Sequence, residues 1–77
     1  MYHVLIHRGD ALADVDAALK ALEGRGVDRE SSGFHKYMHV TQAAQTVVMV
    51  RNRQSPLAAE LRARPGWSEP GDVTLDA

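Results

Sequence analysis

The chain has 77 residues, of which 44% are hydrophobic and 25% charged, and its formal net charge at pH 7 is −1. This length supports one domain with a small core, and the composition is too apolar for a disordered chain. The lack of cysteine excludes disulfides and thiolate metal sites. The small net charge provides no overall field that would attract nucleic acid.

Residues 1–8 lack the basic end and apolar run of a signal peptide, and no stretch approaches the ~20 apolar residues of a membrane span. We therefore expect a soluble, cytoplasmic protein with no membrane contact. A core of this size gives little net stability, so association with a second copy is an expected source of further stability.

The first expected element is a β-strand over residues 2–8. Large apolar residues alternate there with His3, Leu5 and His7, so the histidine face also carries one apolar side chain. Because both faces are partly apolar, the strand should lie in the centre of a sheet.

A helix is expected after the Gly9-Asp10 pair that interrupts this strand. Asp10 is predicted to be the N-cap, with its carboxylate accepting hydrogen bonds from free backbone N–H groups. Gly24 or Gly26 is predicted to end the helix in the left-handed conformation. The apolar stripe of the helix consists of Leu12, Val15, Leu19 and Leu22.

Two further strands are expected after the polar connection at residues 27–33. Residues 46–51 are the most β-prone run in the chain and predict a strand buried on both faces. The preceding strand, residues 34–41, is predicted to carry Phe34, Lys36, Met38 and Val40 on one face and His35, Tyr37 and His39 on the other. The linking residues 42–45 lack the Gly, Asn or Asp of a tight hairpin, which leaves a loop and a helical turn both open.

The last part of the chain predicts a short helix and a short strand. Ser55 and Pro56 are suited to the N-cap and first helical position, and the next proline should end this helix at Arg64. Residues 65–72 are rich in turn-forming residues and predict a loop. Residues 73–75 are then long enough for one edge strand.

These elements predict a single α+β domain over residues 1–77 with the order β-α-β-β-α-β. Right-handed crossovers then favour a ferredoxin-like fold, an antiparallel sheet in the order 4-1-3-2 with both helices on one face. In this arrangement the helices should cover Tyr2, Val4 and Ile6, together with the Phe34 face of the second strand. The face that carries the histidines is expected to remain uncovered.

The four histidines form two pairs of equal spacing, His3 with His7 and His35 with His39. Such a pair chelates a metal from adjacent helical turns, but on a strand the two residues lie ~13 Å apart, too far to share bonds of ~2 Å. Chelation by His35 and His39 would require residues 35–51 to form one helix instead of two strands. We therefore expect neither a metal site nor another cofactor.

Catalytic motifs are weak in this chain, because no serine lies in a Gly-x-Ser-x-Gly motif and no glycine-rich phosphate loop is present. Residues 22–26, then Gly33-Phe34-His35 and the following valine-rich strand, resemble the helix, Gly-x-His strand and hairpin of HicA-type messenger-RNA interferase toxins. This resemblance implies a small ribonuclease with His35 as general acid or base. The chain departs from that family in its leading strand, in Lys36 where a second histidine is usual, and in its lack of a basic composition.

An open sheet face could also bind nucleic acid, as in ferredoxin-like RNA binders whose aromatic side chains stack on bases while cations hold phosphates. Tyr37 and the four histidines are the stacking candidates here, and Lys36, Arg51 and Arg53 are the candidate cations. Our alternative hypothesis is therefore that the chain binds single-stranded RNA. Its slightly acidic net charge is an argument against this hypothesis.

The hypothesis that we favour is a non-enzymatic regulatory or accessory module that binds protein through the open sheet face, as a homodimer or with another partner. Histidine and tyrosine suit such interfaces because each has an apolar ring and a hydrogen-bonding tip. Trp67 is either a contact anchor or a lid over the helix ends. The expected contact surface consists of His3, Leu5, His7, His35, Tyr37, His39, Arg51 and Trp67.

Overall fold

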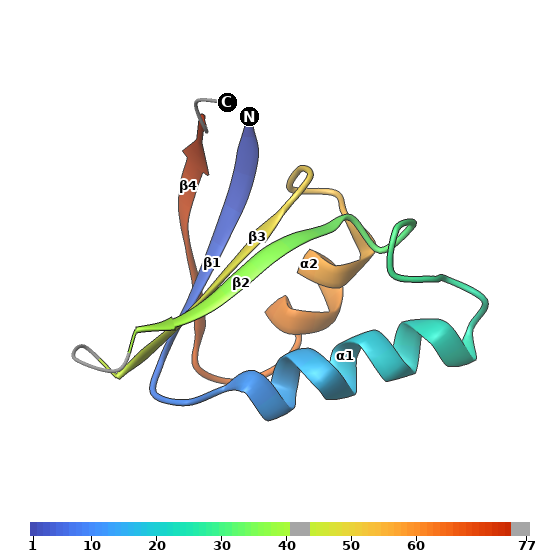
Figure 1. The fold of residues 1–77 in the computed structure, drawn as a ribbon, viewed down its shortest axis with the longest axis horizontal. Helices are drawn as coiled ribbons and strands as arrows, with labels where there is room; N and C mark the ends of the chain where they lie inside the picture. Colours follow the sequence, from blue (N-terminus) through green and yellow to red (C-terminus); the bar gives the residue numbers. More distant parts are fainter. Residues whose placement is uncertain (41–43, 75–77) are drawn as a thin grey trace.

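The computed structural model describes residues 1–40 and 44–74 of the chain (Figure 1). Its elements follow the predicted order. They are β1 (Tyr2–Arg8), α1 (Leu12–Gly24), β2 (Phe34–Val40), β3 (Gln45–Val50), α2 (Pro56–Arg62) and β4 (Trp67–Val73). Within the described ranges, no helix is both long and apolar enough to cross a membrane.

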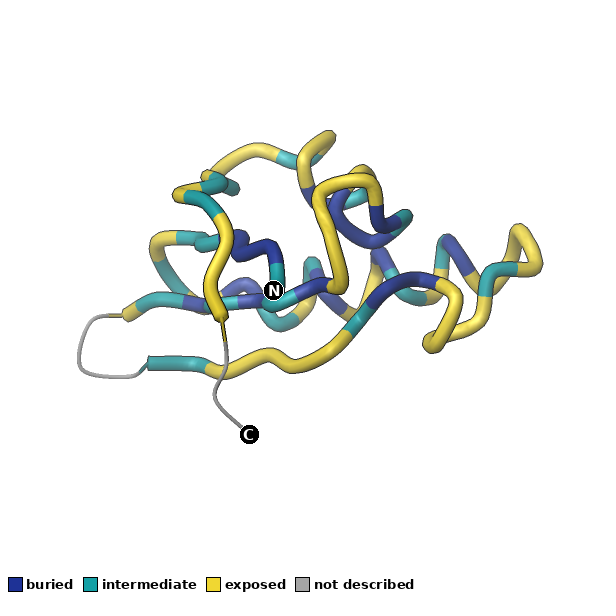
Figure 2. Tube along the Cα trace, turned by 90° about the horizontal axis from the view of Figure 1, so that it is seen from above, coloured by how far each residue is buried: buried dark blue, intermediate teal, exposed yellow. Residues whose placement is uncertain are grey.

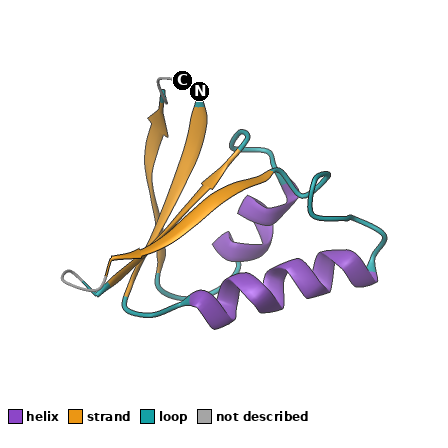
Figure 3. Cartoon of the chain, viewed as in Figure 1, coloured by secondary structure: helices purple, strands orange, loops and turns teal. Residues whose placement is uncertain are grey.

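The four strands form one sheet in the order β2-β3-β1-β4, and every pair of neighbours is antiparallel. This is the predicted order 4-1-3-2 read from the opposite edge of the sheet. Both helices pack on the same face of the sheet (Figure 3), because one buried cluster joins them to the inner strands. The predicted ferredoxin-like α+β fold is therefore confirmed.

The core lies between the helices and the two inner strands. Leu5 of β1 is paired in register with Val48 of β3, and neither side chain has exposed surface. Full burial of a leucine or valine side chain contributes about 1.5–3 kcal/mol, so these residues dominate the stability of a small domain. The buried cluster consists of Leu5, Val15, Ala18, Leu22, Val48, Val50, Leu57, Ala58 and Leu61.

The predicted orientation of β1 is wrong. Successive strand residues point to opposite faces, so the burial of Leu5 in the core places His3 and His7 on the helix side as well. The residues expected to meet the helices, Tyr2, Val4 and Ile6, face away from them, although Val4 is buried at 6% exposure as expected of a core residue. The alternation of side chains along β1 correctly predicted which residues share a face. Both faces contain apolar residues, however, so only packing against the helices decides which face is covered.

The predicted orientation of β2 is correct for Phe34 and His35 but wrong from Lys36 onward. The register with β3 shifts between Phe34 and Lys36, which marks a β-bulge. Phe34 packs against the core as predicted, whereas Met38 and Val40 lie on the face away from the helices. The pairs after the bulge are Tyr37 with Val48, Met38 with Val47 and His39 with Thr46, which places Tyr37 and His39 on the helix side.

β4 occupies the segment that was predicted to be a loop, and Leu75 of the predicted strand lies outside the described residues. Pro70 and Gly71 suggested a turn, but both lie within this strand. They are accommodated because β4 is an edge strand and its register with β1 shifts between Val4 and Ile6. Proline and glycine are tolerated at such a bulge, where a ladder hydrogen bond is already missing.

The helix ends follow the predictions in part. The N-cap of α1 is Ala11 rather than Asp10, although Asp10 Oδ1 accepts a hydrogen bond from the Leu12 N–H at 3.3 Å. Ser55 occupies the N-cap of α2 as predicted, but its Oγ accepts from the Asn52 N–H at 3.0 Å instead of capping the helix. At the other ends, α1 is followed by Gly26 with φ of 83°, as predicted, and α2 ends at Arg62 rather than Arg64.

The segment between β2 and β3 is described only at its end. Thr41 and residues 42–43 lie outside the described residues, so the predicted choice between a loop and a helical turn stays open there. Ala44 is in a turn with φ of 50°, and Gln45 begins β3. The backbone N–H of Gly9 donates to the Ala44 carbonyl, which ties this hairpin to the end of β1.

We predict that Gly33→Ala lowers the free energy of unfolding by about 2 kcal/mol or more, because φ at Gly33 is 85° and an added Cβ would overlap the buried Ser55 side chain. Gly24→Ala is the matched control, since a Cβ there meets no atom within 4 Å and the residue is helical. The control should be neutral or stabilise by up to about 1 kcal/mol. Urea denaturation measures both, and equal effects would contradict the prediction.

Candidate functional site

The structure divides the predicted contact surface between the two faces of the sheet. Leu5 is a core residue and His3 is only 5% exposed, so neither can belong to an open surface. His35 lies on the uncovered face, where its ring stacks on that of Tyr2 with 4.0 Å between centroids. The residues of the predicted surface that lie on the helix side or in a connection are His3, Leu5, His7, Tyr37, His39, Arg51 and Trp67.

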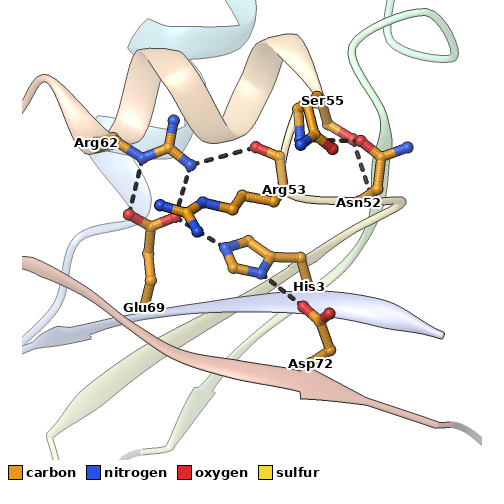
Figure 4. Close-up of polar contacts among 8 residues, drawn as sticks. His3, Asn52, Arg53, Ser55, Arg62, Glu69 and Asp72 are labelled. Carbon is orange, nitrogen blue, oxygen red and sulfur yellow. Dashed lines mark hydrogen bonds and ion pairs between the residues drawn. The ribbon is translucent and has the colours of Figure 1, made fainter.

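His3 is held between two carboxylates on β4 (Figure 4). Its Nδ1 lies 2.7 Å from Asp72 Oδ1, and its Nε2 lies 2.8 Å from Glu69 Oε1. Both ring nitrogens of His3 are thus in contact with a carboxylate oxygen. The ring therefore connects the start of β1 to two points on the edge strand.

Glu69 extends this network to α2. Arg62 donates from Nε to Glu69 Oε2 at 2.8 Å and from Nη2 to Oε1 at 2.6 Å, a two-point contact. The Arg62 hydrogen bonds are the largest cause of a Glu69 pKa lowered to about 2, and the His3 hydrogen bond adds to the effect. Arg62 Nη2 also donates to the Arg53 carbonyl at 3.2 Å, so the network joins β1, β4, α2 and the turn after β3.

A cavity of about 420 Å³ opens beside this network and is lined by His3, Arg53, Glu69, Gly71 and Asp72. General acid-base catalysis needs a histidine nitrogen that can reach a substrate. Both His3 nitrogens already contact carboxylates, so the ring offers no free nitrogen to a ligand in this cavity. Among the described residues, no group of three or more histidine or acidic side chains could hold a metal ion.

His7 and Trp67 form a second tie between β1 and β4. The two rings meet edge to face at 5.2 Å, and Trp67 Nε1 donates to Asp14 Oδ2 of α1 at 3.1 Å. An added Cβ at Gly66 would overlap the His7 ring, so this glycine makes room for it. Trp67 thus bridges the edge strand to α1 beside the core, as expected of a lid rather than of a free contact anchor.

The face away from the helices carries a continuous set of apolar side chains. Figure 2 shows that β2 is exposed along most of its length, while buried residues are concentrated in the inner strands and helices. Met38 and Val73 are among the most exposed large hydrophobic residues of the described chain, at 38% and 37%. Alternation and pairing place Tyr2, Val4, Ile6, Met38, Val47, Met49 and Val73 on this face, which we call the uncovered face.

Sequence reasoning assigned most of these residues to the core, so it missed the candidate surface. In β3, Val48 and Val50 are buried while Val47 and Met49 are only half-buried. In the sequence, however, the four residues form an unbroken apolar run, which does not distinguish a covered face from an uncovered one.

Comparisons of the chain with protein-family models, with curated proteins and with solved structures found no match.

We predict that Glu69→Gln lowers the free energy of unfolding by about 1–2 kcal/mol at pH 7, because it removes charged hydrogen bonds to Arg62 and His3. The Glu69 pKa is lowered from 4.5 to about 2, so its ionised form stabilises the fold fully above pH 4.5. That contribution is lost as pH falls towards 2, where the wild type and the variant should converge.

Denaturation with urea at pH 7, 4 and 2.5 measures this difference. Glu23→Gln changes an exposed carboxylate of α1 and is the control for general effects of charge. A gap between the wild type and Glu69→Gln that stays constant over this range would contradict the assigned role of Glu69.

Proposed function

We propose that this chain is a small non-enzymatic regulatory or accessory module that acts by protein association and forms a homodimer through the uncovered face. The observation that carries this proposal is the set of apolar side chains on that face. Tyr2, Ile6, Met38, Val47 and Met49 are presented on three adjacent strands without a helix above them.

The size of the uncovered face supports a role in association. Four strands spaced ~4.8 Å apart and about seven residues long, with ~3.3 Å per residue, give a face of about 450 Å². The apolar side chains occupy only part of this area, because His35 and Lys36 lie on the same face and Val4 is buried. An apolar patch of a few hundred Å² is the size that functional patches on monomeric proteins have. Two such faces in contact would bury about 900 Å² in total, which is the size of a weak or transient interface.

The polar network supports a non-enzymatic role. His3 and Glu69 contact each other, and Glu69 also pairs with Arg62, so their charged groups are occupied by structural partners. A network of this kind fastens an edge strand, and this explains why ionisable groups line the neighbouring cavity without a reaction being assigned to them.

Single-stranded RNA binding is the second candidate, and the stack of Tyr2 on His35 is the observation that favours it. Lys36 lies on the same face and could contact a phosphate. The other stacking candidates, His3, His7, Tyr37 and His39, are on the helix side, which leaves a smaller platform than the sequence predicted. The ribonuclease hypothesis has His35 alone as its catalytic group.

We predict that the wild type is a dimer and that Met49→Lys weakens dimerisation at least tenfold, because a charge on inner strand β3 would be desolvated in the interface. Ala17→Lys adds the same charge to the exposed side of α1 and should leave the dimer intact. Sedimentation equilibrium from 1 to 500 µM measures the dissociation constants, and circular dichroism checks folding. A wild type that stays monomeric over this range would refute the proposed function.

We predict that the wild type does not bind a fluorescein-labelled single-stranded RNA at low salt, as measured by fluorescence anisotropy. The separate variants Tyr2→Ala and His35→Ala distinguish the two candidate functions, because each removes one ring of the stack. Salt-dependent binding by the wild type that both variants lose would favour the RNA-binding candidate instead.

A further inference from the structure

The two contacts of the buried His3 ring with β4, which we call the His3 clamp, are unequally secured. Glu69 is also held by two hydrogen bonds from Arg62, and its side chain is 23% exposed. Asp72 has His3 as its one side-chain partner within the described part of the chain, and its side chain is 51% exposed. Water can therefore replace His3 as the partner of Asp72 at a much smaller loss than at Glu69.

The two halves of β4 differ in the same way. Before Pro70, the Trp67 side chain is hydrogen-bonded to α1, and Ser68 Oγ donates to a β1 carbonyl at 3.2 Å. Beyond Pro70, among residues 71–73, only Asp72 has a side chain that is hydrogen-bonded to β1. The end of the edge strand therefore depends on the His3 clamp more than its beginning does.

The charge of the imidazole determines whether the clamp can hold both acids. A charged ring has an N–H on each nitrogen, whereas a neutral ring has one N–H and carries a lone pair on its other nitrogen. Such a lone pair would repel a carboxylate oxygen at 2.7 or 2.8 Å, the distances found at the two His3 nitrogens. Histidine is the side chain whose charge ordinarily changes between pH 5 and 8, so a rise in pH removes one of the two contacts.

The unequal security of the acids determines which contact is lost. Glu69 stays in place because leaving the ring would also disturb its two-point charged contact with Arg62. The neutral ring therefore keeps its proton on Nε2, which faces Glu69, and carries the lone pair on Nδ1, which faces Asp72. The half-exposed Asp72 carboxylate then moves into water.

The other charged groups around the ring leave this order unchanged. Arg53, in the turn after β3, lines the same cavity as His3 and disfavours a charge on the ring (Figure 4). Arg62 of α2 is paired with Glu69, and the residue of β3 that is paired with His3 is the uncharged Val50. The two acids are in direct contact with the ring nitrogens, so their effect on the ring is the largest.

We infer that His3 is a pH-sensitive clamp on the edge strand: the charged ring holds Glu69 and Asp72, and the neutral ring keeps Glu69 but releases Asp72 together with residues 71–73. Because the clamped state binds the additional proton, it loses stability relative to the released state as pH rises. Release leaves backbone groups of residues 2–4 on β1 without their partners, and such an edge is a template for an added strand. The clamp lies within one chain, so it operates with or without the proposed homodimer.

Amide hydrogen exchange measured by NMR at pH 5.5 and 8.5 tests the release, after correction for the intrinsic effect of pH on exchange. The measured amides are those of residues 2–4 and 71–73 that are protected at pH 5.5. Their protection should fall at the higher pH at least tenfold more than that of Leu5 and Val48, the buried pair of the inner strands. An equal change at both places would overturn the inference.

Asp72→Asn should remove the pH dependence while keeping the contact. An amide accepts from Nδ1–H through its oxygen and donates to an Nδ1 lone pair through its NH₂ group, so it suits both forms of the ring. Residues 71–73 of this variant should be protected equally at both pH values. Asp16→Asn removes the same charge from an exposed position of α1 and should keep the wild-type pH dependence. An Asp72→Asn variant that also keeps it would overturn the inference.

The ring nitrogens of His3 provide an independent measurement that does not depend on strand release. Their ¹⁵N chemical shifts distinguish the charged ring from its two neutral forms. We expect the charged ring at pH 5.5 and the Nε2–H form at pH 8.5. A neutral ring protonated on Nδ1, or a ring with the same charge at both pH values, would contradict the assigned clamp.

Discussion

The row of side chains that β1 directs towards the helices organises the rest of this fold. Leu5 in the middle of that row is fully buried against both helices. His3 before it binds the two acids of β4, and His7 after it contacts Trp67, which is hydrogen-bonded to α1. One central strand thus connects the core, the edge strand and both helices. The edge strand β4 depends on these ties, because Pro70 and the bulge weaken its backbone pairing with β1.

The same arrangement explains why an apolar surface is left uncovered. A four-stranded sheet has two faces, and two helices, of which α2 spans only Pro56–Arg62, cover one of them. The other face is lined by the alternate residues of the same strands, and a sheet with apolar residues on both faces gains stability by burying both. The proposed association of two copies would bury the second face without a further kind of chain, and it suits a domain whose core is small.

The bulges in the two edge strands give this face its shape. In β2 the bulge places Met38 on the uncovered face and Tyr37, which is still exposed, on the helix side, and in β4 a bulge opens a groove beside Gly71. Each bulge also disrupts the regular backbone edge, which protects a sheet against unspecific strand addition. Both edges of the sheet therefore owe their shape to the same kind of irregularity.

The sequence by itself determined the order of the elements and, through the right-handed crossover rule, the strand order of the sheet. The stripe of α1 and the Ser55-Pro56 start of α2 are local signals, so they could be read without knowing the fold. Only the tertiary structure decided which face of β1 is buried, because His3, Leu5 and His7 alternate with Tyr2, Val4 and Ile6, and either set can meet a helix. The same holds for β4, whose Pro70 and Gly71 indicate a turn unless a neighbouring strand supplies the pairing. Period-two alternation divides a strand into two faces, but the contacts that bury one of them come from residues far away in the chain.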